Sequence, residues 1–150
     1  MKKLITSLFL LTITTNFAQE QVVDTVLQNE QKMQWFKDAK LGIFIHWGLY
    51  SVNGIDESWS FYNGYISHED YVKQTQGFTA KKYDPTAWAN LIKRSGAKYS
   101  VITSKHHEGF ALWDTKFGDF NAVKSSAAKR DVLTPFVSEL RKNNLKVGIY

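Results

Sequence analysis

The chain has 150 residues, 43% of them hydrophobic and 15% aromatic, and it contains no cysteine. This composition is typical of a globular domain, and the absence of thiols excludes disulfides, thiolate metal sites and a lipid-modified cysteine. The formal charge of +5 falls to +3 without Lys2 and Lys3, a mild and scattered excess that argues against a nucleic-acid partner.

The first eighteen residues have the layout of a secretory signal peptide. Two lysines give a basic start, the centre is apolar from Leu4 to about Thr15, and the small residue Ala18 ends the segment. The apolar run is too short to span a bilayer. Cleavage is expected after Ala18, although Asn16 stands where a small residue is usual; the alternative is a buried N-terminal strand or helix. We therefore expect a periplasmic or secreted protein with no membrane partner after removal of residues 1–18.

The next part of the chain predicts one strand and several aromatic-rich connections. Residues 19–33 form a polar lead-in, and 34–40 predict a helix or turn before the apolar run 41–48, which has strand length. The segment 49–67 is rich in Gly, Asn and Ser and predicts a long loop, which its many aromatic residues keep ordered. Residues 68–74 predict a short helix.

Two longer helices are marked by their ends. Asp84 is a predicted N-cap, Pro85 occupies the first helical position, and Gly96 follows the end of that helix. Asp131 is the predicted cap of the second. The apolar face of the first helix is expected to hold Trp88, Leu91 and Ile92. The apolar face of the second is expected to hold Leu133, Phe136, Val137 and Leu140.

Apolar strands at 99–102 and 145–150 complete an order of strand, helix, strand, helix, strand. Such strands predict a parallel sheet covered on both sides, either an open doubly wound sheet or a closed barrel. The first strand is not followed by a Gly-rich phosphate turn. His46 and the pair His106–His107 repeat at successive strand ends, where barrels collect their chemistry. We predict an α/β fold, a (β/α)₈ TIM-like barrel, of which residues 34–150 supply the first three strands and two to three helices.

A metal site is one interpretation of the polar groups at these strand ends. His46, His106, His107 and Glu108 are permitted zinc or iron ligands. Adjacent residues of a strand point to opposite faces, so the two consecutive histidines cannot face one ion unless the strand has already ended. The spacings H-x-H and H-E-x-x-H are both absent. We therefore predict no metal and no cofactor.

A sugar site is the second interpretation. A neutral imidazole offers one hydrogen-bond donor and one acceptor, the same pair that a hydroxyl group offers. Trp and Phe rings supply apolar surface for the C–H faces of a sugar. The segments "FIHWG", "ESWSFY" and "KHHEGFALWD" each mix these ingredients. Taken singly, His46 is equally well a core histidine, and Glu57 a solvated charge.

The motifs "GIFIHWG" and "KHHEGF", in this order and spacing, resemble the N-terminal catalytic region of the α-L-fucosidases, glycoside hydrolase family 29. The resemblance runs from about Trp35 to Tyr150. It implies a retaining exo-glycosidase that removes terminal α-L-fucose from a fucosylated glycan through a covalent intermediate. The family's nucleophile and acid/base both fall beyond Tyr150, so no catalytic residue is expected in this chain.

The resemblance also implies which residues bind the sugar. They are His46, His106, His107, Trp59, Phe44 and Glu57. The histidines would bind hydroxyl groups, the tryptophan would donate its ring N–H, and the phenylalanine would line the apolar side. The family usually places the glutamate directly before the tryptophan, whereas Ser58 intervenes here, so Glu57 reaches the pocket only through a one-residue shift. Glu108 is expected to be structural, bonded to backbone or to a neighbouring side chain.

Two other functions stay open. One is a fucose-binding fragment or inactive relative that does not cleave the sugar, and the other is a metal-dependent barrel hydrolase.

Overall fold

A computed structural model describes residues 27–150, so the expected signal peptide at 1–18 lies outside the described residues. The structure divides into two units, Met1–Lys40 and Leu41–Tyr150. In the first unit, residues 27–39 form one continuous helix, which joins the end of the expected lead-in to the segment 34–40. None of the helices that the structure describes is long and apolar enough to cross a membrane.

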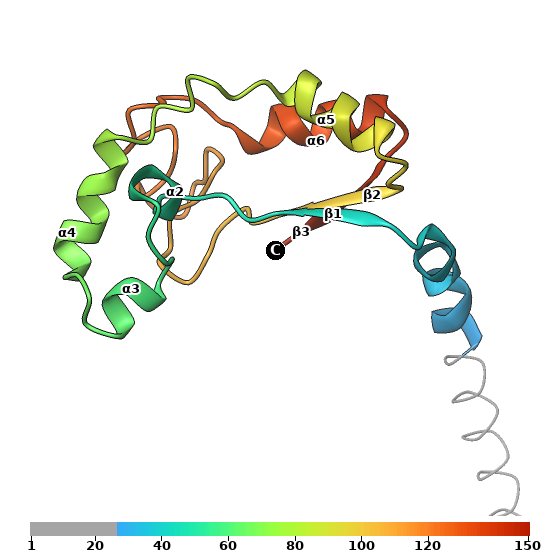
Figure 1. Ribbon diagram of the computed structural model, residues 1–150, viewed down its shortest axis with the longest axis horizontal. Coiled ribbons are helices and arrows are strands. Elements are labelled where there is room, and N and C mark those ends of the chain that lie inside the picture. The colour runs from blue at the N-terminus through green and yellow to red at the C-terminus, as the bar shows by residue number, and fades with distance from the viewer. Residues whose placement is uncertain (1–26) are drawn as a thin grey trace, which may run out of the picture. The chain divides into compact units, whose positions relative to one another are not determined.

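Three parallel strands form the sheet of the second unit, in the order β1-β2-β3 (Figure 1). They are β1 (Gly42–Ile45), β2 (Tyr99–Ile102) and β3 (Lys146–Ile149). Ile45 lies opposite Ile102, which lies opposite Ile149, so the three strands end level with one another. The predicted parallel sheet is therefore confirmed, and the residues that follow each strand emerge at one edge.

Two helices, α5 (Pro85–Arg94) and α6 (Leu133–Lys142), pack against each other on the same side of this sheet (Figure 1). The core between helices and sheet includes Ile102, Phe136 and Leu140, all fully buried. The sequence predicts helices on both sides. The structure differs because the connection from β1 to β2 through α5 and the connection from β2 to β3 through α6 run in the same direction along the sheet. Two right-handed connections in the same direction place both helices on one face of the sheet.

The ends of α5 agree with the sequence prediction, but the face that it buries is rotated around the helix axis relative to the predicted apolar face. The Asp84 carboxylate accepts a hydrogen bond from the Ala87 N–H at 2.9 Å, and Gly96 has the left-handed φ of +86°. Ala89 and Ile92 are buried, whereas Leu91, predicted on the apolar face, is 61% exposed. A helix turns about 100° per residue. Because of this rotation, Leu91 lies nearly opposite Ala89 and away from the core.

The cap of α6 also agrees with the sequence prediction, which placed it at Asp131. The Asp131 carboxylate accepts hydrogen bonds from the N–H groups of Leu133 (2.9 Å) and Thr134 (2.8 Å), although the helix itself begins one residue later than this cap implies. Two of the four predicted apolar positions, Phe136 and Leu140, are fully buried. The predicted helix is confirmed.

The connection from β1 to α5 is more regular than predicted. The expected loop at 49–67 contains two one-turn helices, α2 (Tyr50–Asn53) and α3 (Trp59–Tyr62). They are followed by α4 (His68–Val72) and the 3₁₀ helix η1 (Lys73–Gln76), which replace the predicted short helix. Each is four or five residues long, too short for its periodicity to be detected in the sequence.

Candidate functional site

The site begins where β1 and β2 end, and Thr103 joins the two ends. Its hydroxyl accepts a hydrogen bond from the Trp47 N–H at 2.8 Å and donates to the Trp47 carbonyl at 2.9 Å. Its own N–H donates to the Ile45 carbonyl at 3.0 Å. Thr103 is fully buried, so these bonds fix the backbone on both sides of His46. The sequence analysis missed this residue; its one signal is a hydroxyl directly after an apolar strand.

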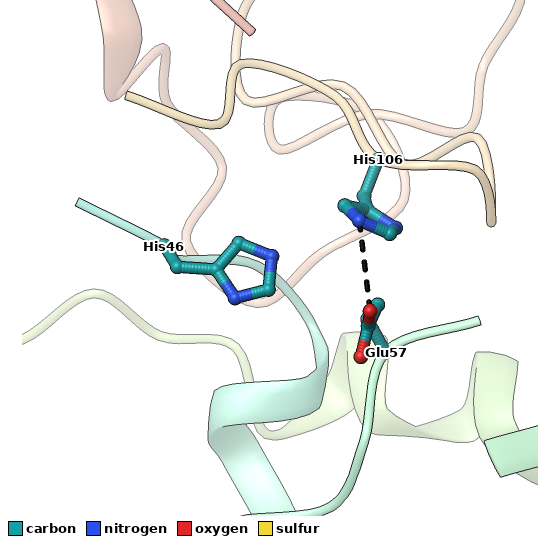
Figure 2. A group of neighbouring side chains, drawn as sticks. All are labelled: His46, Glu57 and His106. Carbon is teal, nitrogen blue, oxygen red and sulfur yellow. Dashed lines mark ion pairs between the residues drawn. The ribbon is translucent and has the colours of Figure 1, made fainter. Parts of the chain in front are cut away.

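Three ionisable side chains meet at this edge, as Figure 2 shows. One ligand atom from each of His46, Glu57 and His106 lies within 4.8 Å of the other two. The Nε2 atom of His106 is 3.7 Å from the Oε1 atom of Glu57, and the two histidine rings are 5.3 Å apart between centroids. The structure therefore brings Glu57 to the histidines despite the intervening Ser58.

These residues reach the cluster from three separate segments. His46 follows β1, Glu57 lies between α2 and α3, and His106 belongs to the loop after β2. Since side chains alternate between the faces of a strand, His46 continues the face of Phe44, opposite the face that carries α5 and α6. The cluster is therefore on the side of the sheet that these two helices leave uncovered.

A cavity of about 490 Å³ adjoins the cluster. Its lining residues are Glu57, Ser58, Trp59, Phe61, Tyr62, His106, His107 and Tyr150. The cavity thus combines four aromatic rings with two imidazoles and a carboxylate. This is the mixture of apolar surface and paired donors and acceptors that a sugar ring requires.

Two predicted site residues lie beside this cavity and not in its lining. His46 belongs to the three-residue cluster, and its ring lies 4.8 Å from that of Tyr50. Phe44 is 55% exposed, and its ring lies 6.4 Å from His46 and 6.0 Å from Tyr150. Phe44 therefore contacts the site through its neighbours.

Tyr150 is a lining residue that the sequence analysis did not select. Its ring stacks on His106 at 5.7 Å with an interplanar angle of 26°. The backbone carbonyl of Tyr150 accepts hydrogen bonds from both the N–H (3.0 Å) and the hydroxyl (2.8 Å) of Ser104. Tyr150 follows β3 as His46 follows β1, so its position one residue after a strand was the available signal.

Behind His106 lies Glu108, whose side chain is 1% exposed. Its Oε2 atom is 3.5 Å from the Nδ1 atom of His106. Burial, reinforced by the nearby charge of Glu57, raises the pKa of Glu108 to about 7. Burial also lowers the pKa of His106. Both groups are therefore shifted toward their neutral forms.

The cluster can bind two kinds of ligand. Neutral imidazoles and a carboxylate can exchange hydrogen bonds with several hydroxyl groups of one sugar. The same three groups, His46, Glu57 and His106, are also a permitted donor set for a cation. Only His106 of the two consecutive histidines belongs to this set; β2 has already ended at Ile102, and His107 lines the neighbouring cavity instead.

A parallel α/β sheet with its polar site at the carboxyl ends of the strands belongs to the class of α/β enzyme folds. The sequence profile of the α-L-fucosidase family matches residues 10–150. The chain belongs to this family.

Three relatives show what share of a family member this chain covers. The plasma α-L-fucosidase of Homo sapiens is 35% identical over 141 residues, which cover 83% of this chain and 30% of that protein. The Thermotoga maritima α-fucosidase in complex with fucose has a TM-score of 0.67 at 40% identity, over 77% of this chain and 33% of that one. A Bacteroides thetaiotaomicron family 29 α-L-fucosidase was trapped as a covalent intermediate with 2-fluoro-fucosyl fluoride. It has a TM-score of 0.72 at 33% identity, over 79% of this chain and 29% of that one. The chain spans about 30% of the relatives that it matches.

Proposed function

We propose that this chain is the N-terminal part of an exo-acting, retaining α-L-fucosidase that hydrolyses terminal α-L-fucose from glycans. The observation that carries the proposal is the cluster of His46, Glu57 and His106 beside an aromatic cavity, in a member of this family. The similarity to a fucosidase in complex with fucose supports the choice of sugar.

The proposed role of the cluster is to bind the hydroxyl groups of the fucose ring. The three side chains converge from different segments, so their donors and acceptors point to one volume from several directions. His107 and the ring N–H of Trp59 add further donors at the cavity wall. The aromatic rings would pack on the apolar C–H face of the sugar, on which fucose also carries a methyl group.

Bond cleavage with retention needs two carboxyl groups about 5–5.5 Å apart, one as nucleophile and one as general acid/base. Glu57 faces the cavity, but Glu108 is buried behind His106 and is not a lining residue. We therefore assign the catalytic pair to later strands of a complete (β/α)₈ barrel, of which β1, β2 and β3 form the first part. The trapped covalent intermediate of the Bacteroides relative supports the retaining course.

The proposed site of action is outside the cytoplasm. The basic and apolar layout of residues 1–18 supports export followed by cleavage after Ala18. Mass spectrometry of the N-terminus of the exported protein tests this part of the proposal. A mature N-terminus at residue 19 is expected, and an intact Met1 in the exported protein would contradict it.

The decisive experiment compares the 150-residue chain with the longer enzyme that carries it. Both are incubated with a chromogenic α-L-fucoside and with the matching α-D-galactoside as control. We expect turnover of the fucoside by the longer enzyme alone. Fucose binding without turnover by the longer enzyme would instead show a non-catalytic binding protein, and loss of activity with chelator would show a metal-dependent hydrolase. Turnover by the short chain would place the catalytic carboxylates within it.

A further inference from the structure

The buried carboxyl group of Glu108 has no role in the proposed contacts with fucose. Its side chain is 1% exposed and that of His106 is 8% exposed. The Oε2 atom of Glu108 and the Nδ1 atom of His106 are both buried without a hydrogen-bond partner among the described residues, yet they lie 3.5 Å from each other. Buried polar groups are almost always paired, so these two atoms require an explanation.

Their arrangement is that of a carboxyl group orienting an imidazole. A displacement of a few tenths of an ångström would make the contact a hydrogen bond of ordinary length. The other ring nitrogen, Nε2, then points toward Glu57, 3.7 Å away, at the cavity. Contacts of this kind often lengthen in unliganded sites and tighten when the ligand is bound.

We propose that Glu108 is a positioning residue, which holds His106 through Nδ1 and so presents Nε2–H to Glu57 and to a hydroxyl of the bound sugar. This inference rests on the proposed function for its ligand, but not for the pairing itself. One proton must lie between Nδ1 and Oε2, and the position of that proton decides whether Nε2 donates or accepts.

The surroundings favour the proton on Glu108. Burial raises the pKa of Glu108 to about 7 and lowers the pKa of His106, so burial favours both the neutral acid and the neutral ring. The carboxylic acid then donates to Nδ1, and the ring keeps its own proton on Nε2, where the Glu57 carboxylate accepts it. Above pH 7 a Glu108 carboxylate needs a proton on Nδ1 instead. A neutral ring then turns an Nε2 lone pair toward Glu57, and sugar binding weakens.

Other ionisable groups around the pair do not reverse this assignment. Those that act on it from the surrounding segments are Glu57, His46, His107, Tyr50 and Tyr71. The two tyrosines have raised pKa values because of burial and stay neutral near pH 7, and the two histidines disfavour a charge on His106. Glu57 is the one group that favours a proton on the ring, and its oxygen lies on the Nε2 side.

The test uses the longer enzyme that carries this segment, with ¹⁵N-labelled histidine and magic-angle-spinning NMR to identify the protonated ring nitrogen of each residue. Three variants are compared with the parent: Glu108→Gln, Glu108→Leu and, as an exposed control, Glu69→Gln. In the parent we expect His106 to carry its proton on Nε2 at pH 6 and to change near pH 7. The Gln variant, whose amide can donate to Nδ1 at any pH, should keep Nε2–H from pH 6 to 8. The Leu variant should show both tautomers, and the Glu69 control should behave as the parent does.

The dissociation constant of L-fucose gives the second readout. We expect it to rise about tenfold between pH 6 and 8 in the parent and the control, and to stay flat in Glu108→Gln. A parent that keeps Nδ1–H at pH 6, or a Gln variant with the parent's pH step, would overturn the positioning role. If Glu108→Leu does not fold, the Gln variant decides alone. An enzyme that binds no fucose but shows the expected tautomers would contradict the proposed function and leave the pairing intact.

Discussion

His46 and His106 come from different strands, and their rings lie 5.3 Å apart at the carboxyl edge of the sheet. Neither position is needed for the core, because His46 is exposed and His106 contacts the cavity. Thr103 fixes the backbone on both sides of His46, and the Glu108 carboxyl group lies 3.5 Å from the Nδ1 atom of His106. Substitution of either histidine should therefore affect the ligand more than the fold.

We expect His46→Ala and His106→Ala to lower kcat/KM for an α-L-fucoside in the longer enzyme. Each would leave a sugar hydroxyl without its partner, at a cost of about 1–3 kcal/mol, or roughly five- to 150-fold. Steady-state kinetics measures the effect, and the melting temperature checks the fold. His68→Ala, at an exposed position of α4, is the matched control.

Metal content separates the two interpretations of the same cluster. A ligand to a metal would behave differently, because its loss would remove a stoichiometric ion and nearly all activity. Elemental analysis of the parent and of His106→Ala decides this. Unchanged kinetics in both histidine variants would mean that they are structural residues.

A different prediction follows for Thr103, because its hydroxyl bonds both the N–H and the carbonyl of Trp47, the residue after His46. Thr103→Val keeps the shape but leaves the Trp47 N–H and carbonyl without their partner inside the protein. We expect a loss of about 1–3 kcal/mol in the free energy of unfolding, together with weaker fucose binding. Urea denaturation measures the first and calorimetry the second. Thr103→Ser, which keeps the hydroxyl, should recover most of both; a stable Val variant with normal binding would disprove the role.

The helices α5 and α6 begin in the same way, with an aspartate that accepts hydrogen bonds from free N–H groups of the first turn. In α5 the proline that follows supplies a suitable φ and has no N–H to satisfy. These local signals make the start of each helix independent of the rest of the fold. The buried faces, by contrast, depend on how the two helices meet each other and the sheet.

Asp84→Ala should lower the free energy of unfolding by about 0.5–2 kcal/mol, because the Ala87 N–H loses its acceptor. Thermal or urea denaturation of the longer enzyme measures the loss. Asp84→Asn keeps an acceptor oxygen and should behave nearly as the parent does. Equal destabilisation by both substitutions would show that the charge near the helix start, and not the cap, is what matters.

The unit Leu41–Tyr150 presents apolar surface at the β3 side of its sheet. Ile149 is 55% exposed and Tyr150 is 53% exposed. Among the described residues β3 has a strand neighbour, β2, on one side only. An uncovered parallel edge with apolar side chains is a template for pairing with another chain.

We therefore expect the isolated 150-residue chain to self-associate. Light scattering coupled to size-exclusion chromatography should show a mass that grows with concentration, and the thermal transition should be broad. Ile149→Lys should reduce the association by placing a charge at the edge. A monomer at all concentrations, with a sharp cooperative melt, would show that residues 27–150 already form a self-sufficient unit.

Signals that act within a few residues could be interpreted from the sequence alone. The strand segments, the caps at Asp84 and Asp131 and the turn at Gly96 depend on neighbouring backbone groups, so the sequence predicted them correctly. The repeated histidines at strand ends indicated the polar edge, since parallel strands bring their carboxyl ends together.

Contacts between distant segments were decided by the tertiary structure. The distance between Glu57 and His106 depends on how α2 and α3 fold back, and no local pattern encodes it. The same holds for Tyr150 stacking on His106. Leu91 is exposed because the direction in which α5 meets the sheet depends on packing with α6. Local propensity therefore determined where elements begin and end, whereas packing across the chain decided which side chains form the site.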